Sequence, residues 1–137
     1  ASDVYKRQMF NRWIETDGLK NYADENGLGL AVFSPLAQGL LTDKYIGSSL
    51  AASKRPWMNN TPDKKTIDKL HKLNEIASSR GQKLSQMALS WVLRDGKITT
   101  VLIGASRPEQ IAENAESAFK TSFTSDELIK IEEIINS

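Results

Sequence analysis

Two short runs of apolar residues, 28–33 and 101–104, stand out from a chain whose other apolar positions mostly recur at helical spacing. The first run lies between Gly27 and the pair Ser34-Pro35, and the second follows a polar stretch after Gly96. A short continuous apolar run bounded by turn residues is typical of a strand buried on both faces, as in parallel sheets covered by helices. Proline has no N–H for a strand ladder, so we expect the first strand to end at Ser34-Pro35.

Helical spacing predicts one helix before the first strand. Leu19, Tyr22 and Ala23 share one face of this helix, and Asn26-Gly27 ends it because glycine tolerates the left-handed conformation.

Two further helices are predicted between the strands, the first opening at Thr61-Pro62 and ending at Gly81, the second covering residues 85–94. We interpret the apolar stripe on each as core, including the methionine and tryptophan of the second. The expected buried residues are Ile67, Leu70, Leu73 and Ala77 on the first and Leu84, Met87, Ala88, Trp91 and Val92 on the second.

Capping boxes predict the last two helices, since Ser106 is followed by Glu109 and Thr124 by Glu127. Residues 37–60 form a long loop with a short helical turn near 40–44, and a loop of this length is uncommon unless it is functional. Only two strands are visible, and two strands do not make a stable sheet with so many helices. We therefore expect the carboxy-terminal part of a larger α/β protein.

The first eight residues show no clear period and are left unassigned. We interpret residues 1–7 as a candidate sequencing or assembly artefact and exclude them from the expected fold. The domain is expected to cover residues 9–137.

Composition excludes several classes of function. The net charge of +1 favours neither nucleic acid nor a membrane surface as partner, and zero cysteines exclude disulfides, thiolate metal sites and a cysteine nucleophile. No apolar run reaches about 18 residues and no signal peptide is visible, so a cytoplasmic protein is expected. The lone His71 lies between lysines on a helical pattern and is interpreted as a solvated residue, and no metal site is expected.

Three separated motifs resemble the aldo-keto reductases, in the right order and spacing. They are "AVFSPLAQGLLTDKY" (31–45), "GQKLSQMALSWVL" (81–93) and "VLIGASRPEQIAEN" (101–114). The similarity is greatest to the branch with the potassium-channel β-subunits and related bacterial oxidoreductases. It implies an incomplete (β/α)8 TIM barrel, with 28–33 as strand 7 and 101–104 as strand 8.

The resemblance explains the abrupt passage from strand to helix near Gly104. In such barrels the loops after strands 7 and 8 commonly build a phosphate site. A helix opened by Ser106 would direct free N–H groups and its positive dipole end at that site, while Gly104 and Ala105 allow close approach of the backbone. Arg107 could add a bidentate contact to a phosphate.

The resemblance also implies NADP(H) as cofactor and twelve residues that bind it. Phe33 matches the aromatic position that stacks on the nicotinamide ring. The remaining matches are Ser34, Pro35, Leu36, Gly39 and Lys44 along the pyrophosphate, Gly104, Ser106, Arg107 and Gln110 around the adenosine ribose and its 2′-phosphate, and Glu113 and Asn114 at the adenine.

Departures from the family pattern bear on both cofactor choice and catalysis. One branch has Lys in place of Gly104 and Arg in place of Gln110 to grip the 2′-phosphate, so Ser106 and Arg107 would have to discriminate NADP from NAD here. Residues 53–55, Ser-Lys-Arg, fall where this branch often closes a basic clasp over the cofactor. The family's catalytic Asp, Tyr, Lys and His belong to the first half of the barrel, so this chain is expected to carry no catalytic residue and to be inactive alone.

Three hypotheses stay open on the sequence. The chain is part of an NADPH-dependent reductase acting on a small-molecule carbonyl substrate, or of a nucleotide-binding regulatory subunit of the same fold, or it is an interaction module. Each site residue also has a plainer interpretation: Ser106 as a helix cap, Ser34-Pro35 as a strand end, and Arg107 as a solvated charge.

Overall fold

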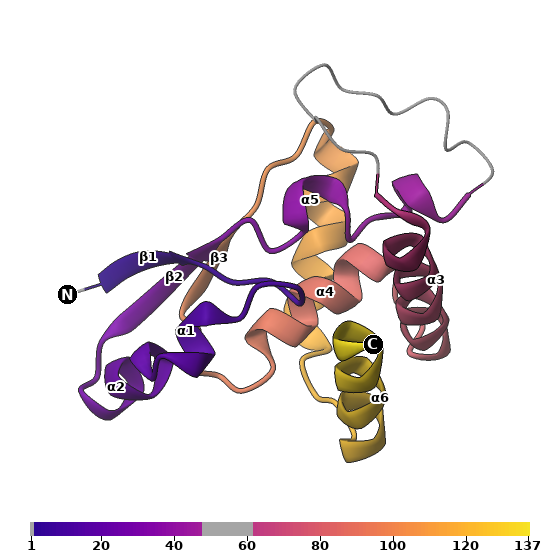
Figure 1. The fold of residues 1–137 in the computed structure, drawn as a ribbon. Coiled ribbons are helices and arrows are strands. Elements are labelled where there is room, and N and C mark those ends of the chain that lie inside the picture. The colour runs from indigo at the N-terminus through magenta and orange to yellow at the C-terminus, as the bar shows by residue number, and fades with distance from the viewer. Residues whose placement is uncertain (1, 48–61) are drawn as a thin grey trace.

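The computed structural model describes residues 2–47 and 62–137 and contains a parallel three-stranded sheet covered by helices (Figure 1). The strands are β1 (Ser2–Lys6), β2 (Gly29–Phe33) and β3 (Thr100–Leu102), in the order β1-β2-β3. The α-helices are α1 (Trp13–Thr16), α2 (Leu19–Glu25), α3 (Lys64–Ser79), α4 (Leu84–Leu93), α5 (Pro108–Ala115) and α6 (Ser125–Asn136). The 3-10 helices are η1 (Ala37–Gly39), η2 (Asp43–Tyr45) and η3 (Glu116–Phe119).

The two predicted strands are confirmed as parallel neighbours. Val32 of β2 lies opposite Val101 of β3 in the register. The second strand is shorter than predicted, because it ends at Leu102 and leaves Ile103 and Gly104 outside the ladder. Both chain segments that follow these strands therefore start at the same edge of the sheet.

A third strand, β1, corrects the expectation of two strands. It pairs parallel with β2, with Tyr5 opposite Val32. Its sequence, SDVYK, has only two apolar residues and no alternation, which is why hydrophobic patterning missed it. The residue after it, Arg7, is 0% exposed and donates to Glu15 Oε1 at 2.6 Å and to the Val92 carbonyl at 2.9 Å.

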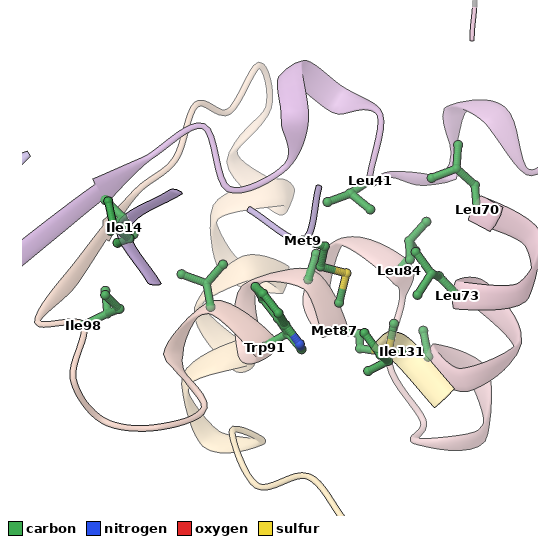
Figure 2. Packing of buried hydrophobic residues seen from close by; sticks show 14 of the residues in the cluster. Met9, Ile14, Leu41, Leu70, Leu73, Leu84, Met87, Trp91, Ile98 and Ile131 are labelled. Carbon is green, nitrogen blue, oxygen red and sulfur yellow. The ribbon is translucent and has the colours of Figure 1, made fainter. Parts of the chain in front are cut away.

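The core lies between one face of the sheet and the helices, with α4 at its centre (Figure 2). Leu30 and Val32 of β2 are buried against the helices, whereas Phe33 at the end of the same strand is exposed. Met87 and Trp91 of α4 are buried, which confirms that their stripe is core. Helices thus cover one face of the sheet.

The ends of the predicted helices are partly corrected. Helix α3 is capped by Asp63, whose Oδ1 accepts from the Thr66 N–H at 2.8 Å; the predicted cap, Thr61, lies outside the described residues. The capping box of α6 is confirmed, with Thr124 Oγ1 accepting from the Glu127 N–H at 3.2 Å and Glu127 Oε2 accepting from the Thr124 N–H at 2.8 Å.

The helix predicted before the first strand is present as α2, and its apolar residues are unequally buried. Tyr22 shares helical spacing with Leu19 and Ala23, yet 61% of it is exposed, and Ala23 is the buried residue of this helix. The helix is two turns long, and its apolar stripe is narrower than the spacing suggested.

The other face of the sheet carries exposed apolar side chains. Val4, Phe33 and Leu102 come from the three different strands and are each 40–51% exposed. Within the described ranges, every helix is either too short or too polar to span a bilayer.

Candidate functional site

A cleft of about 780 Å³ opens where the chain leaves β2 and β3. We call it the β2–β3 cleft. Because the two strands are parallel, their carboxyl ends meet at one edge, which is where ligands bind in open α/β sheets. Its walls come from the loop after β2, the segment after β3, the start of α4 and one side of α5. The lining residues are Ser34, Pro35, Leu36, Gln38, Gly39, Thr42, Asp43, Lys44, Lys83, Ser85, residues 102–107, Gln110, Glu113 and Asn114. A volume of this size suits a small organic molecule or cofactor.

The loop after β2 has an unusual backbone. Ser34, Ala37 and Gln38 all have positive φ angles, of 55°, 50° and 57°. Side-chain-bearing residues avoid this region unless the surrounding structure holds them there. The result is a tight turn that brings both sides of the loop to the cleft.

Gly39 continues this turn with a φ of 91°, and it lies directly against Lys44. A Cβ atom at Gly39 would come within 3.2 Å of Lys44 Nζ. The absence of a side chain therefore lets the Lys44 ammonium lie over the backbone of its own loop, on the wall of the cleft.

The segment after β3 corrects the predicted capping box at Ser106 and Glu109. Arg107, not Ser106, is the N-cap of α5, with Pro108 at the first helical position. Gln110 takes the capping role, since its Oε1 accepts from the Ser106 N–H at 2.8 Å and from the Arg107 N–H at 3.3 Å.

These hydrogen bonds change the argument for a phosphate site. The N–H groups of Ser106 and Arg107 are already used by Gln110, so they are not free donors for an anion. Positive charge at this end of the cleft comes from side chains instead.

The far wall contains an ion pair between α4 and α5. Lys83 Nζ lies 2.7 Å from Glu113 Oε1, and Gln86 Nε2 donates to the Glu113 carbonyl at 2.9 Å. The hydrogen bond to Glu113 is the largest influence on the ammonium and raises the pKa of Lys83, although the nearby charge of Arg107 acts in the opposite direction. Lys83, Glu113 and Arg107 therefore share one end of the cleft.

Eleven of the twelve residues named from the sequence line this cleft. They are Ser34, Pro35, Leu36, Gly39, Lys44, Gly104, Ser106, Arg107, Gln110, Glu113 and Asn114. Phe33 is not on its wall but ends β2 immediately before it, where it is 40% exposed. The basic residues 53–55 lie outside the described residues.

Sequence reasoning missed several charged or polar residues of the cleft, chiefly Lys83, Asp43 and Thr42. Asp43 and Thr42 were within a quoted motif but had no assigned role. Lys83 also lies within a quoted motif, residues 81–93, two positions before the predicted second helix, and neither the motif nor the spacing shows which neighbour it faces.

A parallel sheet with helices, and with a cleft at its strand ends, defines the molecule as an α/β protein. The model of the Aldo/keto reductase family matches residues 3–136. The chain therefore belongs to the aldo-keto reductase family.

Named relatives fall into two groups. The L-glyceraldehyde 3-phosphate reductase of Escherichia coli (strain K12) is 42% identical over 135 residues. A putative voltage-gated potassium channel subunit beta of Schizosaccharomyces pombe is 39% identical over 119 residues. Among solved structures, the glycerol dehydrogenase of Gluconobacter oxydans superposes with a TM-score of 0.78 at 26% identity.

The chain spans about two fifths of the length of these relatives. The match covers 93% of this chain but 39% of the Escherichia coli relative, and 80% against 35% for the Schizosaccharomyces pombe one. For the Gluconobacter oxydans structure the shares are 98% and 42%. The three-stranded sheet is accordingly part of the family's barrel.

Proposed function

We propose that this chain is the NADP(H)-binding part of an aldo-keto reductase that reduces aldehydes or ketones, and that its strands are the last ones of the barrel. The observation that carries the proposal is the convergence of eleven residues on one cleft, from two segments, residues 34–44 and 104–114, that are far apart in the sequence. Family membership supplies the oxidoreductase class.

The donor set of the cleft fits a dinucleotide with phosphate groups. Lys44, Lys83 and Arg107 provide three positive charges against two negative ones from Asp43 and Glu113. The bare backbone at Gly39 leaves room for the Lys44 ammonium on the wall of the cleft, where it can bind a phosphate.

In this proposal, different residues at the cleft bind different parts of the cofactor. Phe33 provides an exposed aromatic face at the mouth of the cleft for the nicotinamide, which supplies hydride to a carbonyl carbon when it is bound. Ser34 and Lys44 hold the pyrophosphate, Arg107 the ribose phosphate, and Glu113 the adenine.

Titration of the chain with NADPH, followed by the fluorescence of the reduced nicotinamide and by calorimetry, tests the proposal. Saturable binding with one site is expected. No binding of either NADPH or NADH would overturn it.

Carbonyl reduction is expected to need the rest of the barrel, because no residue of this chain matches the catalytic motif of the family. Purified chain mixed with NADPH and an aromatic aldehyde should show no loss of NADPH absorbance above buffer. Turnover that persists after removal of host reductases would contradict this assignment.

A second candidate function is a nucleotide-binding regulatory subunit, favoured by the 39% identity to a potassium channel subunit beta. Both candidates predict cofactor binding. They differ in the protein that contains the whole barrel, since only an enzyme would turn over carbonyl substrates rapidly.

A further inference from the structure

We propose that Lys83 is a specificity-determining residue of the β2–β3 cleft, which pairs with Arg107 to hold a phosphate on the adenosine ribose. This inference rests on the proposed function. It concerns a residue that lies outside the twelve implied by the family pattern.

The placement of Lys83 follows from two helices, α4 and α5, that begin at the same cleft. Lys83 precedes α4 and Arg107 precedes α5, and Lys83 forms an ion pair at 2.7 Å with Glu113 of α5. The charge of Arg107 acts on the Lys83 ammonium. All three line the cleft. A second cation therefore stands beside the one that the sequence motif supplies.

Lys83 also keeps hydrogen-bonding capacity for a ligand. A lysine ammonium has three N–H donors, and the pair with Glu113 uses one of them. The side chain is 48% exposed and Glu113 is 43% exposed, so the pair faces water and contributes little to fold stability. Two N–H donors of the ammonium therefore remain for an anion in the cleft that Lys83 lines.

The backbone N–H groups at the start of α5 are already hydrogen-bonded, which makes the charge of Lys83 more important for binding an anion. Gln110 Oε1 occupies the N–H groups of Ser106 and Arg107, and Gly104 and Gln110 carry no charge. A ribose phosphate carries about −1.5 to −2 charges at neutral pH. The charge of Arg107 alone is offset by the carboxylate of Glu113, whereas Arg107 and Lys83 together leave this end of the cleft with an excess of one positive charge to attract that phosphate.

Two small probes isolate this phosphate without requiring the whole cofactor. Adenosine 2′,5′-bisphosphate carries the ribose 2′-phosphate, and adenosine 5′-monophosphate lacks it. We expect the unaltered chain to bind the bisphosphate more tightly, as measured by calorimetry.

Lys83→Met should weaken binding of the bisphosphate by about twofold to fivefold, the upper range for a partly exposed charge pair, and leave the monophosphate nearly unchanged. Lys83→Arg should keep most of the preference. The difference between the unaltered chain and Lys83→Met should shrink as salt is added, because screening weakens an exposed charge contact. Lys130→Met, which removes an equal charge from the exposed face of α6, serves as control and should change neither affinity.

Equal loss for both probes would overturn the inference, since it would mean that Lys83 acts only by holding Glu113. Unchanged affinities would overturn it too. In either case binding by the unaltered chain would leave the proposed function standing. Failure of the unaltered chain to bind either probe would instead overturn the proposed function, and this inference with it.

Discussion

At the scale of single residues, Gly39 shows how the loop after β2 sets the position of the Lys44 ammonium. Its φ of 91° excludes most side chains, and its missing Cβ makes room for Lys44 Nζ. Gly39→Ala should cost about 1–2 kcal/mol in the free energy of unfolding from backbone strain, and should also displace the Lys44 ammonium.

Gly96→Ala separates these two effects. Gly96 also has a positive φ, of 68°, but nothing lies within 4 Å of the position that its Cβ would take. Chemical denaturation should show similar destabilisation for both variants, whereas only Gly39→Ala should lose affinity for NADPH. Equal cofactor affinity in the two variants would show that Lys44 does not depend on this close approach.

Arg107 is the second residue whose charge can be tested alone. Arg107→Ala should weaken NADPH binding by about tenfold, the lower end for hydrogen bonds to charged groups, because the side chain is exposed. NADH lacks the 2′-phosphate and should be little affected. Calorimetry with both cofactors decides between this role and that of a solvated charge, for which neither affinity would change.

At the scale of elements, a charged network joins β1, α1 and the end of α4. Glu15 lies 2.6 Å from Arg7 Nη2 and 2.7 Å from Arg12 Nη2. The guanidinium of Arg94 lies 3.8 Å from the centre of the Trp91 ring, which extends this network to the core. The network connects the residue that follows β1 with α1 and with the end of α4, which lies far along the chain.

The network predicts acid sensitivity. Burial alone would raise the pKa of Glu15, but hydrogen bonding to Arg12 and the charges of Arg7 and Arg94 outweigh burial and lower it below its ordinary value of 4.5. A carboxyl whose pKa is lowered by folding stabilises the fold above the unfolded pKa, and this contribution is lost as the pH falls below about 4.5 towards the folded value. Glu15→Gln should therefore lower stability at neutral pH and flatten its decline with acid.

Denaturant titrations from neutral pH to about pH 3 measure this decline across the relevant range of carboxyl pKa values. Glu75→Gln removes an exposed carboxylate from α3 and should leave the slope unchanged. The same slope in Glu15→Gln as in the unaltered chain would show that the network does not govern acid stability.

Elements with strong local signals were predictable, and elements that depend on distant partners were not. The apolar residues Leu30 and Val32 predict the buried strand β2, and the apolar stripe with Met87 and Trp91 predicts the buried face of α4. In both elements the burial follows directly from the spacing of the apolar residues. β1 has no such signal: Arg7 is buried only because Glu15 and the Val92 carbonyl receive its hydrogen bonds. The cap of α5 was misplaced by one residue, since Ser106 and Arg107 are both plausible caps until the side chain of Gln110 is located.

The residues of the candidate site also fall into those that local sequence predicts and those that depend on a distant partner. Motifs located the residues of the two strand-end loops, such as Lys44 and Arg107, because each follows directly from the chain around it. The role of Lys83 can be inferred only once the packing of α4 and α5 is known, because its partner Glu113 is 30 positions away in the sequence.

At the scale of the whole molecule, the uncovered sheet face dominates the expected behaviour. Val4, Phe33 and Leu102 expose apolar surface on a sheet whose edge strands, in the part of the chain that the structure describes, are β1 and β3. Such edges invite pairing with other chains. We expect the folded chain to associate with itself through these edges and the exposed apolar face, and therefore to give a mass above that of the monomer in light scattering.

Leu102→Lys tests the cause, because a lysine on an edge strand opposes edge-to-edge pairing. It should raise the monomeric fraction in light scattering, whereas Ile129→Lys, on the exposed side of α6, should change it less. A sharp cooperative melt from a monomeric unaltered chain would contradict this expectation.

The left-handed residues Ser34, Ala37 and Gln38 have a consequence for directed evolution of this chain. Each non-glycine residue in this region costs roughly 1 kcal/mol that glycine would not incur. A screen that rewards heat resistance alone should therefore recover Ala37→Gly repeatedly. The same variant should bind cofactor less well, because a loop that glycine has loosened must be ordered again on binding, so a screen for stability and a screen for affinity should select opposite residues at this one position.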